Sequence, residues 1–382
     1  MNSAVEVQDI SGQGKGLVNR DGPISPQSLL LSVPLEACWS VPGILEDAVF
    51  LSAVKDGEFQ TALDPERMLS LYLLYVRDHI QQYPERREHL ENLPKTYENA
   101  LFYTPEQLVT NCSFDLTVSH LLKQVEADYV NVCGLIVDPV WRFTLEDYKW
   151  ALASIQSRSM DFLLDGQHLR LLVPFADFMN HSFSPNATHQ LNLETKSVEI
   201  VAAAPIAKGE QIVISYGQVG NNRLLRIYGF IIDGNPFDSF PLYLQTDSSA
   251  PLYDRKKALM ESAGLSIEQT IVPIFRSDPK TSLKPVMQYL RIQRADTEEA
   301  LALVAKTRGA DAVDPEMECQ IAKSLLEALK EMFDNISIPD GSLEDQTSDS
   351  MILNALKVGS VEKSTIASAI LELNSLSEEK KL

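Results

Sequence analysis

At 382 residues the chain is longer than one compact core usually is and predicts two domains, and its 45% hydrophobic content argues against a disordered chain. Asp and Glu number 53 against 33 Lys and Arg, a net charge of -20, and no run of Lys and Arg supplies the basic face with which proteins grip nucleic acid, so we expect no nucleic-acid partner. Such acidity indicates either a solvated surface alone or an enzyme that attracts a basic protein segment.

Short strands and turns are expected in the N-terminal segment. Residues 4–7 alternate between apolar and polar side chains, residues 11–16 are rich in glycine, and residues 29–34 form another apolar strand. From about residue 58 to residue 157 the apolar residues recur with a helical period. The helices expected there are one that ends near Gln82 and two more at 104–128 and 144–157.

After Leu169 the pattern returns to strands and then becomes helical again. The expected strands are 171–174, 197–201 and 211–214. The helices expected beyond them are 221–227, 253–263, 283–292, 297–307, 315–334 and 361–376. Strands, helices, strands and again helices predict a β domain with a helical insertion, followed by a helical C-terminal domain.

The four cysteines lie far apart, at Cys38, Cys112, Cys133 and Cys319, and form no Cys-x-x-Cys pair. This spacing argues against a zinc site built from cysteine and against a disulfide scaffold, and it indicates a reducing compartment. No run of 18 apolar residues occurs, so we expect no membrane-spanning helix. The predicted partners therefore include neither a metal ion nor a membrane.

The glycine-rich segment Gly12-Gln13-Gly14-Lys15-Gly16 has three interpretations. It resembles part of a dinucleotide-binding loop, but that motif needs a helix directly after it, and residues 17–23 do not favour a helix. It also fits a hairpin turn. The third interpretation is a cradle in which the backbone approaches a small ligand closely.

A polar cluster, Asn180-His181-Ser182, follows the apolar strand. Taken alone, His181 is more often a hydrogen-bonded structural histidine than a base or metal ligand, and His189 is too isolated to complete a metal site. The residue types for a Ser-His-Asp hydrolase are present, but the Gly-x-Ser-x-Gly elbow that would expose the nucleophile is missing. The triplet Asn186-Ala187-Thr188 matches a glycosylation sequon, which the cysteine usage argues against.

Two tyrosines that precede glycine, Tyr216 and Tyr228, complete a set of motifs whose order resembles the SET domain. The resemblance is to the branch typified by the RuBisCO large-subunit lysine methyltransferase, and it covers nearly the whole chain. The motifs that carry it are 14–18, Trp150 with Ala151, Ser157 with Arg158, 177–182, 209–217 and 222–230.

The resemblance implies an α+β fold: a knotted β SET domain over residues 1–238 with a helical insertion at about 58–157, followed by an all-α substrate-binding-like domain over residues 239–382. It implies a protein-lysine N-methyltransferase that uses S-adenosylmethionine, acts as a monomer on a non-histone protein and resides in the chloroplast stroma, with the cytoplasm or nucleus as alternatives. The implied site residues are Gln13, Gly14, Lys15 and Arg158 at the methionine end of the cofactor, Asn180 and His181 at its adenine side, and Ser157, Asp177, Tyr216 and Tyr228 along the lysine channel.

The chemistry implied by this resemblance is an in-line displacement at a sulfonium, in which positioning supplies much of the rate. The attacking lysine amine must be neutral, and a desolvated channel beside the sulfonium favours that form. Tyr216 is the expected catalytic residue, because its hydroxyl can hydrogen-bond the amine and direct its lone pair.

This chain differs from the branch on the substrate side. The prototype has a tyrosine shortly after its Asn-His-Ser segment, whereas residues 186–192 contain none, and residues 159–162 lack an arginine that the prototype carries. These differences leave the substrate and the number of methyl groups open, although Tyr228 favours lysine over histidine as the target. One alternative is a SET-like protein that has lost catalysis and binds a partner through its C-terminal helices. Another is a nucleotide-dependent oxidoreductase that uses the glycine-rich segment.

Overall fold

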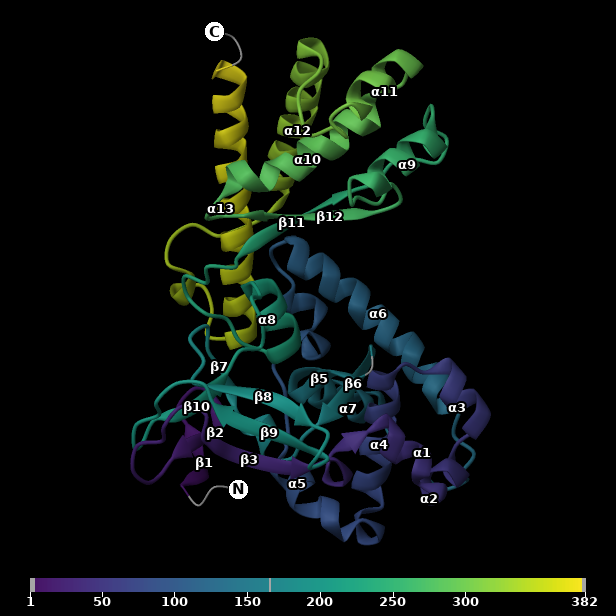
Figure 1. Ribbon diagram of the computed structural model, residues 1–382, viewed down its shortest axis with the longest axis vertical. Coiled ribbons are helices and arrows are strands. Elements are labelled where there is room, and N and C mark those ends of the chain that lie inside the picture. Colours follow the sequence, from purple (N-terminus) through teal and green to yellow (C-terminus); the bar gives the residue numbers. More distant parts are fainter. Residues whose placement is uncertain (1–3, 165, 380–382) are drawn as a thin grey trace. The chain divides into compact units, whose positions relative to one another are not determined.

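The computed structural model describes residues 4–164 and 166–379 (Figure 1). Its contacts define two compact units. The first contains the described residues up to Phe102, with His120–Val219 and Arg226–Gly229. The second contains Tyr103–Ser119, Gly220–Leu225 and the described residues from Phe230 onward. The α+β class is confirmed, whereas the predicted domain limits at 238/239 stay a prediction.

Three small sheets form the β part of the first unit. Their strand orders are β1-β2-β10-β7, β3-β9-β8 and β4-β6-β5. The strands are β1 (Val5–Ile10), β2 (Gly14–Asn19), β3 (Leu29–Pro34), β4 (Trp39–Ser40), β5 (Ser159–Leu164), β6 (Gln167–Leu172), β7 (Asn180–His181), β8 (Ala187–Asn192), β9 (Ser197–Ala202) and β10 (Gln211–Ile214). β10 pairs antiparallel with β2 and parallel with β7, so it brings the N-terminal hairpin and the Asn-His segment into one sheet.

The glycine-rich segment is the turn of a hairpin. β1 and β2 pair antiparallel, with Ile10 opposite Gly14, and Gly12 and Gly14 have positive φ angles of 73° and 72°. Only glycine adopts this conformation at no steric cost. The hairpin interpretation is therefore confirmed. The dinucleotide-loop interpretation is wrong, because a strand rather than a helix follows the turn.

The predicted helical insertion lies between β4 and β5. Its α-helices are α1 (Val41–Glu46), α2 (Ala48–Ala53), α3 (Asp56–Ala62), α4 (Pro65–Asp78), α5 (Arg87–Asn92), α6 (Ser113–Gly134) and α7 (Leu145–Arg158). α4 begins where Asp64 accepts a hydrogen bond from the backbone of Arg67 and where Pro65 needs no donor partner. Every residue from Met68 to Val76 is buried, so α4 forms the centre of the core of the insertion.

The start of α6 differs from the prediction. The helix was expected at 104–128, but it begins only at Ser113, because Pro105–Gln107 forms a short 3₁₀ turn and Asn111 has a positive φ of 55°. A residue in this left-handed conformation cannot continue a right-handed helix. The amphipathic pattern therefore extends further toward the N-terminus than the helix does.

The second unit is mainly helical. Its α-helices include the start of α8 (Asn221–Tyr228), then α9 (Tyr253–Ser262), α10 (Pro279–Arg294), α11 (Glu298–Ala305), α12 (Pro315–Asn335) and α13 (Ser350–Glu379). It also contains a two-stranded sheet that the sequence did not predict, formed by β11 (Ser239–Leu244) and β12 (Thr270–Phe275). One face of this sheet is buried through Phe240, Leu242, Val272 and Ile274. The helical C-terminal region is thus confirmed, with one small sheet added.

A buried carboxylate joins three helices of the second unit. Glu362 of α13 accepts hydrogen bonds from the backbone N–H of Ser113, at 2.8 Å, and from the Asn222 side chain, at 2.8 Å. Ser113 is the first residue of α6, where a negative charge is favourable, and Asn222 lies in the first turn of α8. In the part of the chain that the structure describes, no helix is both long and apolar enough to cross a membrane.

Candidate functional site

Tyr216 lies just beyond β10, in the first unit, and is held through both its backbone and its side chain. Its hydroxyl donates to the carbonyl oxygen of Met179 at 2.7 Å, and its backbone N–H donates to Nδ1 of His181 at 2.9 Å. Its ring stacks on that of Tyr228, with centroids 4.6 Å apart. Burial raises the pKa of the Tyr216 hydroxyl well above its ordinary value, so this group stays protonated at neutral pH.

His181 is a fixed, neutral member of this group rather than a free base. Its Nδ1 accepts from Tyr216, so the neutral ring carries its proton on Nε2, and this buried Nε2 has no hydrogen-bond partner. Burial lowers the pKa of His181 below the ordinary value of 6.5. Because the only lone pair of the ring is already used, the structural interpretation of His181 is favoured over a general base.

The state of His181 gives a prediction about pH. Because the folded protein binds a proton at His181 less readily than the unfolded chain does, the free energy of unfolding should fall as the pH drops below 6.5. We expect the Cε1–H resonance of His181 in a two-dimensional NMR titration to shift with a midpoint below pH 6.5. Burial also lowers the pKa of His189. A His189→Gln variant therefore identifies the His189 signal, so that it is not mistaken for that of His181. A midpoint at or above 6.5 would contradict this environment.

Asn180 joins the N-terminal hairpin to β10. Its Nδ2 donates to Oε1 of Gln211 at 2.7 Å and more weakly, at 3.4 Å, to the carbonyl oxygen of Lys15, while Gln211 in turn donates to Gln13 at 3.3 Å. The ammonium of Lys15 bonds Asn92 and lies 5.8 Å from the centroid of the Phe178 ring. The structure thus brings together Gln13, Lys15 and Asn180, three of the residues that the resemblance places at the cofactor.

Gly16 lets these side chains approach the hairpin. A Cβ atom there would lie 2.7 Å from Cγ1 of Ile10, 2.9 Å from Oε1 of Gln211 and 3.1 Å from Nδ2 of Asn180. Contacts under 3.0 Å do not occur without displacement of the neighbours. The hydrogen-bonded side chains of Asn180 and Gln211, which come from β7 and β10, therefore occupy the space that a side chain at this position would need.

We expect Gly16→Ala to destabilise the protein by about 1–3 kcal/mol, because the added methyl group overpacks this strand and displaces the Asn180–Gln211 pair. Urea unfolding measures this change. Gly22→Ala is the matched control: a Cβ atom at Gly22 meets nothing within 4 Å, and the change should stay within about 0.5 kcal/mol. Equal stability of the two variants would show that the pair does not depend on Gly16.

Arg158, the last residue of α7, is half-buried and contacts Asp177. Its Nη1 donates to the carbonyl oxygen of Asp177 at 2.9 Å and lies 3.5 Å from Oδ2 of the same residue. Burial opposes the charge on Arg158, but Asp177 and Tyr97 outweigh it and raise the pKa of the guanidinium above its ordinary value. The Asp177 side chain is fully buried. Arg158 is therefore a cation and Asp177 its partner.

Ser157 makes only a local contact. Its hydroxyl donates to the carbonyl oxygen of Ala153 at 2.6 Å, one turn earlier in α7. Gly14 lies in the hairpin turn with open space on its Cβ side. The roles predicted for Ser157, Asp177 and Tyr228 in a lysine channel, and for Gly14 at the cofactor, stay predictions.

Three buried polar atoms of the predicted site residues have no hydrogen-bond partner: Nε of Arg158, Oδ1 of Asp177 and Nε2 of His181. Buried polar groups in folded proteins are nearly always paired, so atoms of this kind call for a ligand or a bound water. Two are N–H donors and one is an anionic acceptor. The atoms of the Arg158–Asp177 pair, one donor and one anionic acceptor, fit a ligand that carries both an anionic group and polar hydrogens, as the amino-acid end of S-adenosylmethionine does.

Several residues of this site were missed by the sequence analysis. His89, Trp39 and Tyr97 contact the Arg158–Asp177 pair directly or through one neighbour, and they lie in stretches without any motif. The Tyr216 hydroxyl donates to the backbone carbonyl of Met179, and no pattern of side chains predicts a bond to a backbone atom. Gln211 did lie within the motif 209–217 and could have been found there.

The sequon at Asn186 has a structural role. Asn186 is buried, its Nδ2 donates to the carbonyl oxygen of Gln211 at 2.8 Å, and its Oδ1 accepts from the backbone of Val213 at 2.9 Å. A buried amide whose oxygen and nitrogen both bond the backbone of β10 is not available for glycosylation. Within residues 4–164 and 166–379, no group of three or more His, Cys, Asp or Glu side chains lies close enough together to hold a metal ion.

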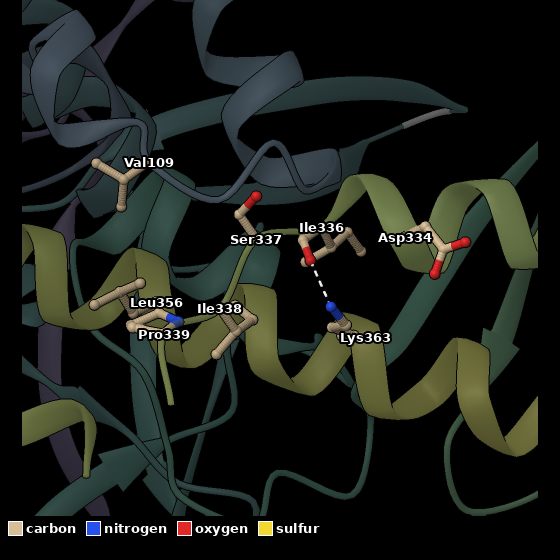
Figure 2. Close-up of a pocket in the computed structure, with 8 residues that line it drawn as sticks. All are labelled: Val109, Asp334, Ile336, Ser337, Ile338, Pro339, Leu356 and Lys363. Carbon is tan, nitrogen blue, oxygen red and sulfur yellow. Dashed lines mark hydrogen bonds between the residues drawn. The ribbon is translucent and has the colours of Figure 1, made fainter. Parts of the chain in front are cut away.

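One cavity of about 560 Å³ lies in the second unit (Figure 2). It is lined by Val109, Asp334, Ile336, Ser337, Ile338, Pro339, Leu356 and Lys363. The amine of Lys363 already donates to the carbonyl oxygen of Ile336 at 2.7 Å and lies 4.6 Å from the centroid of the Phe333 ring. Lys363, the one cationic residue among those that line the cavity, is thus already hydrogen-bonded. None of the residues of the predicted site lines this cavity.

Comparisons with known proteins give two family matches. The SET domain model matches residues 55–217, and the Rubisco LSMT substrate-binding model matches residues 247–365. Solved structures with a similar fold include a SET domain of LSMT bound to lysine and AdoHcy (TM-score 0.83, 20% identity, 99% of this chain and 88% of the other) and Rubisco LSMT bound to AdoMet (TM-score 0.80, 20% identity, 99% and 88%).

Two kinds of curated relatives are similar in sequence. The ribosomal lysine N-methyltransferase set10 of Schizosaccharomyces pombe is 27% identical over 57% of this chain and 41% of its own length. The actin-histidine N-methyltransferase of Homo sapiens is 32% identical over 39% of this chain and 25% of its own length. The matched region therefore spans less than half the length of these relatives.

Proposed function

We propose that this chain, which matches the SET domain model over residues 55–217 and the Rubisco LSMT substrate-binding model over residues 247–365, is a protein methyltransferase that uses S-adenosylmethionine. The finer proposal is that it methylates the side-chain amine of a lysine in a non-histone protein. The observation that carries the proposal is the setting of Tyr216, buried, stacked on Tyr228 and hydrogen-bonded to both Met179 and His181.

The Tyr216 hydroxyl is oriented for a role as acceptor. Its own proton is used by the carbonyl oxygen of Met179, at 2.7 Å, so its lone pairs remain to accept an N–H of an incoming amine. An amine held in this way presents its lone pair in a fixed direction, and such orientation supplies much of the rate of an in-line displacement. The raised pKa of Tyr216 keeps the group a hydroxyl, so it adds no negative charge that would favour the ammonium form.

The residues around Arg158 fit the cofactor. S-adenosylmethionine would supply a methyl group on a positively charged sulfonium, and its carboxylate would find a cation in Arg158 and an unpaired donor in Nε of that residue. The backbone at Gln13 and Lys15 and the Asn180–His181 strand would hold the rest of the molecule. The unpaired Nε2–H of His181 adds another donor on that side.

Lysine is proposed as the target in preference to histidine. The relatives include both a ribosomal lysine enzyme and actin-histidine enzymes, so similarity by itself does not choose between them. Tyr228 favours lysine, because its ring stacks on Tyr216 and would supply a second aromatic wall for a long, flexible lysine side chain. Action as a monomer in the chloroplast stroma, or alternatively in the cytoplasm or nucleus, stays a prediction.

The test is transfer of labelled methyl groups from S-adenosylmethionine to proteins of a cell extract, followed by mass spectrometry of the modified residues. We expect the label on lysine. Label on histidine would overturn the finer proposal and keep protein methylation. Cofactor binding in a calorimetric titration, without transfer to any protein, would instead support a SET-like protein that has lost catalysis.

A further inference from the structure

Behind the Arg158–Asp177 pair lies a buried chain of hydrogen bonds. Nε1–H of Trp39 donates to Nδ1 of His89 at 2.8 Å, and Nε2 of His89 lies 3.1 Å from Oδ2 of Asp177. The four residues come from four separate segments: β4, α5, the end of α7 and the 3₁₀ turn at Ala176–Phe178. The His89 side chain is 6% exposed and that of Asp177 is 0% exposed, so water does not compete for these bonds.

Trp39 determines which way the His89 ring donates. An indole N–H can only donate, so Nδ1 of His89 must be the acceptor, and the neutral ring then carries its proton on Nε2. That proton points to Oδ2 of Asp177. The tryptophan therefore fixes the tautomer and the orientation of His89, and His89 fixes one oxygen of the carboxylate.

This arrangement leaves one donor of Arg158 and one acceptor of Asp177 unpaired. Because His89 holds Oδ2 of Asp177, Arg158 meets that oxygen only at 3.5 Å and makes its better bond, at 2.9 Å, with the Asp177 carbonyl. Nε of Arg158 and Oδ1 of Asp177 remain buried and without partners. If the carboxylate were free to rotate, it could form a bidentate pair with Nε and Nη2 of the guanidinium and so occupy the Nε donor that an anionic ligand needs.

We propose that His89, held by Trp39, is a positioning residue for the cofactor: it anchors Asp177 and so keeps Arg158 available for the carboxylate of S-adenosylmethionine. This inference rests on the proposed function. His89 acts on Arg158 through Asp177, to which it is hydrogen-bonded. Its effect should therefore appear in cofactor affinity, with little change in kcat at saturating cofactor or in KM for the protein substrate.

The experiment is a calorimetric titration of S-adenosylmethionine, and separately of S-adenosylhomocysteine, into the wild type, His89→Phe and His89→Gln. Loss of a charge-assisted hydrogen bond should raise the Kd of His89→Phe about tenfold, equivalent to about 1.4 kcal/mol. Glutamine can accept from Trp39 with its oxygen and donate to Asp177 with its nitrogen, so His89→Gln should restore most of the affinity. Trp39→Phe, which frees the tautomer of His89, should weaken binding as well.

His79→Phe is the matched control. His79 is another histidine of the helical insertion, bonded through Nδ1 to the carbonyl oxygen of Tyr75 and stacked on the Tyr75 ring, and it makes no contact with Asp177. It should leave the Kd unchanged even if the protein becomes less stable. Thermal melting of each variant without cofactor separates a loss of affinity from a loss of fold.

The outcomes distinguish this inference from the proposed function. Equal Kd values for the wild type and a folded His89→Phe would overturn the positioning role and leave methyl transfer untouched. Binding by the wild type without methyl transfer would overturn the proposed activity, while the same titrations still test His89. If His89→Gln bound the cofactor no better than His89→Phe, this would also count against the positioning role of His89. If the wild type bound no cofactor, both the proposed cofactor site and the positioning role would be overturned.

Discussion

Replacing Tyr216 by phenylalanine should lower kcat/KM for methyl transfer by about a hundredfold or more, because the amine loses the acceptor that orients it. The substitution keeps the ring, and with it the stacking on Tyr228 at 4.6 Å. It removes only the oxygen that bonds the carbonyl of Met179. The measurement is the steady-state rate of labelled methyl transfer at saturating cofactor.

The control for this variant is Tyr243→Phe, a tyrosine of β11 that is 52% exposed. It loses a hydroxyl on the surface of the second unit and should keep both rate and stability. Cofactor affinity should be unchanged in Tyr216→Phe, since the ring and the backbone contact with His181 persist. A rate for Tyr216→Phe within about threefold of the wild type would be well below the effect expected from lost orientation and would remove Tyr216 from the catalytic role.

Arg158→Met should destabilise the fold by about 3 kcal/mol, because it leaves the buried carboxylate of Asp177 without its cation. It also removes the donor to the carbonyl oxygen of Asp177. The same variant should lose most of its affinity for S-adenosylmethionine, since the carboxylate of the ligand then lacks its partner. Urea unfolding and calorimetric titration measure the two effects separately.

Arg255→Met is the comparison for an ion pair in water. Arg255 pairs with Glu298 in the second unit, and both side chains are 56% exposed. Its loss should change the free energy of unfolding by no more than about 1 kcal/mol. The double variant Arg158→Met, Asp177→Leu should be more stable than Arg158→Met, because it no longer buries an unpaired charge. A destabilisation of Arg158→Met equal to that of Arg255→Met would show that Asp177 does not need this cation.

The elements with strong periodicity could be predicted from the sequence. Strand β3 at Leu29–Pro34 and strand β10 at Gln211–Ile214 were expected with the bounds that they have, and helix α12 at Pro315–Asn335 to within one residue. The sheet of β11 and β12 was missed. Its strands carry Pro241 and Pro273 opposite each other. Proline argues against a strand as long as the neighbouring strand is unknown, so the sequence did not predict this sheet.

The order of the motifs determined the class of fold and the residues worth testing, because each motif is local: a glycine turn, a strand end, a tyrosine before glycine. What each residue does was decided by the tertiary structure. The carbonyl of Met179, the Gln211 amide and the His89–Trp39 pair reach the site across gaps of 31 residues or more, through the parallel pairing of β7 with β10 and the packing of the helical insertion. The direction of a hydrogen bond and the burial of a side chain could not be predicted from the sequence pattern, since both depend on which distant atoms exclude water and complete each bond.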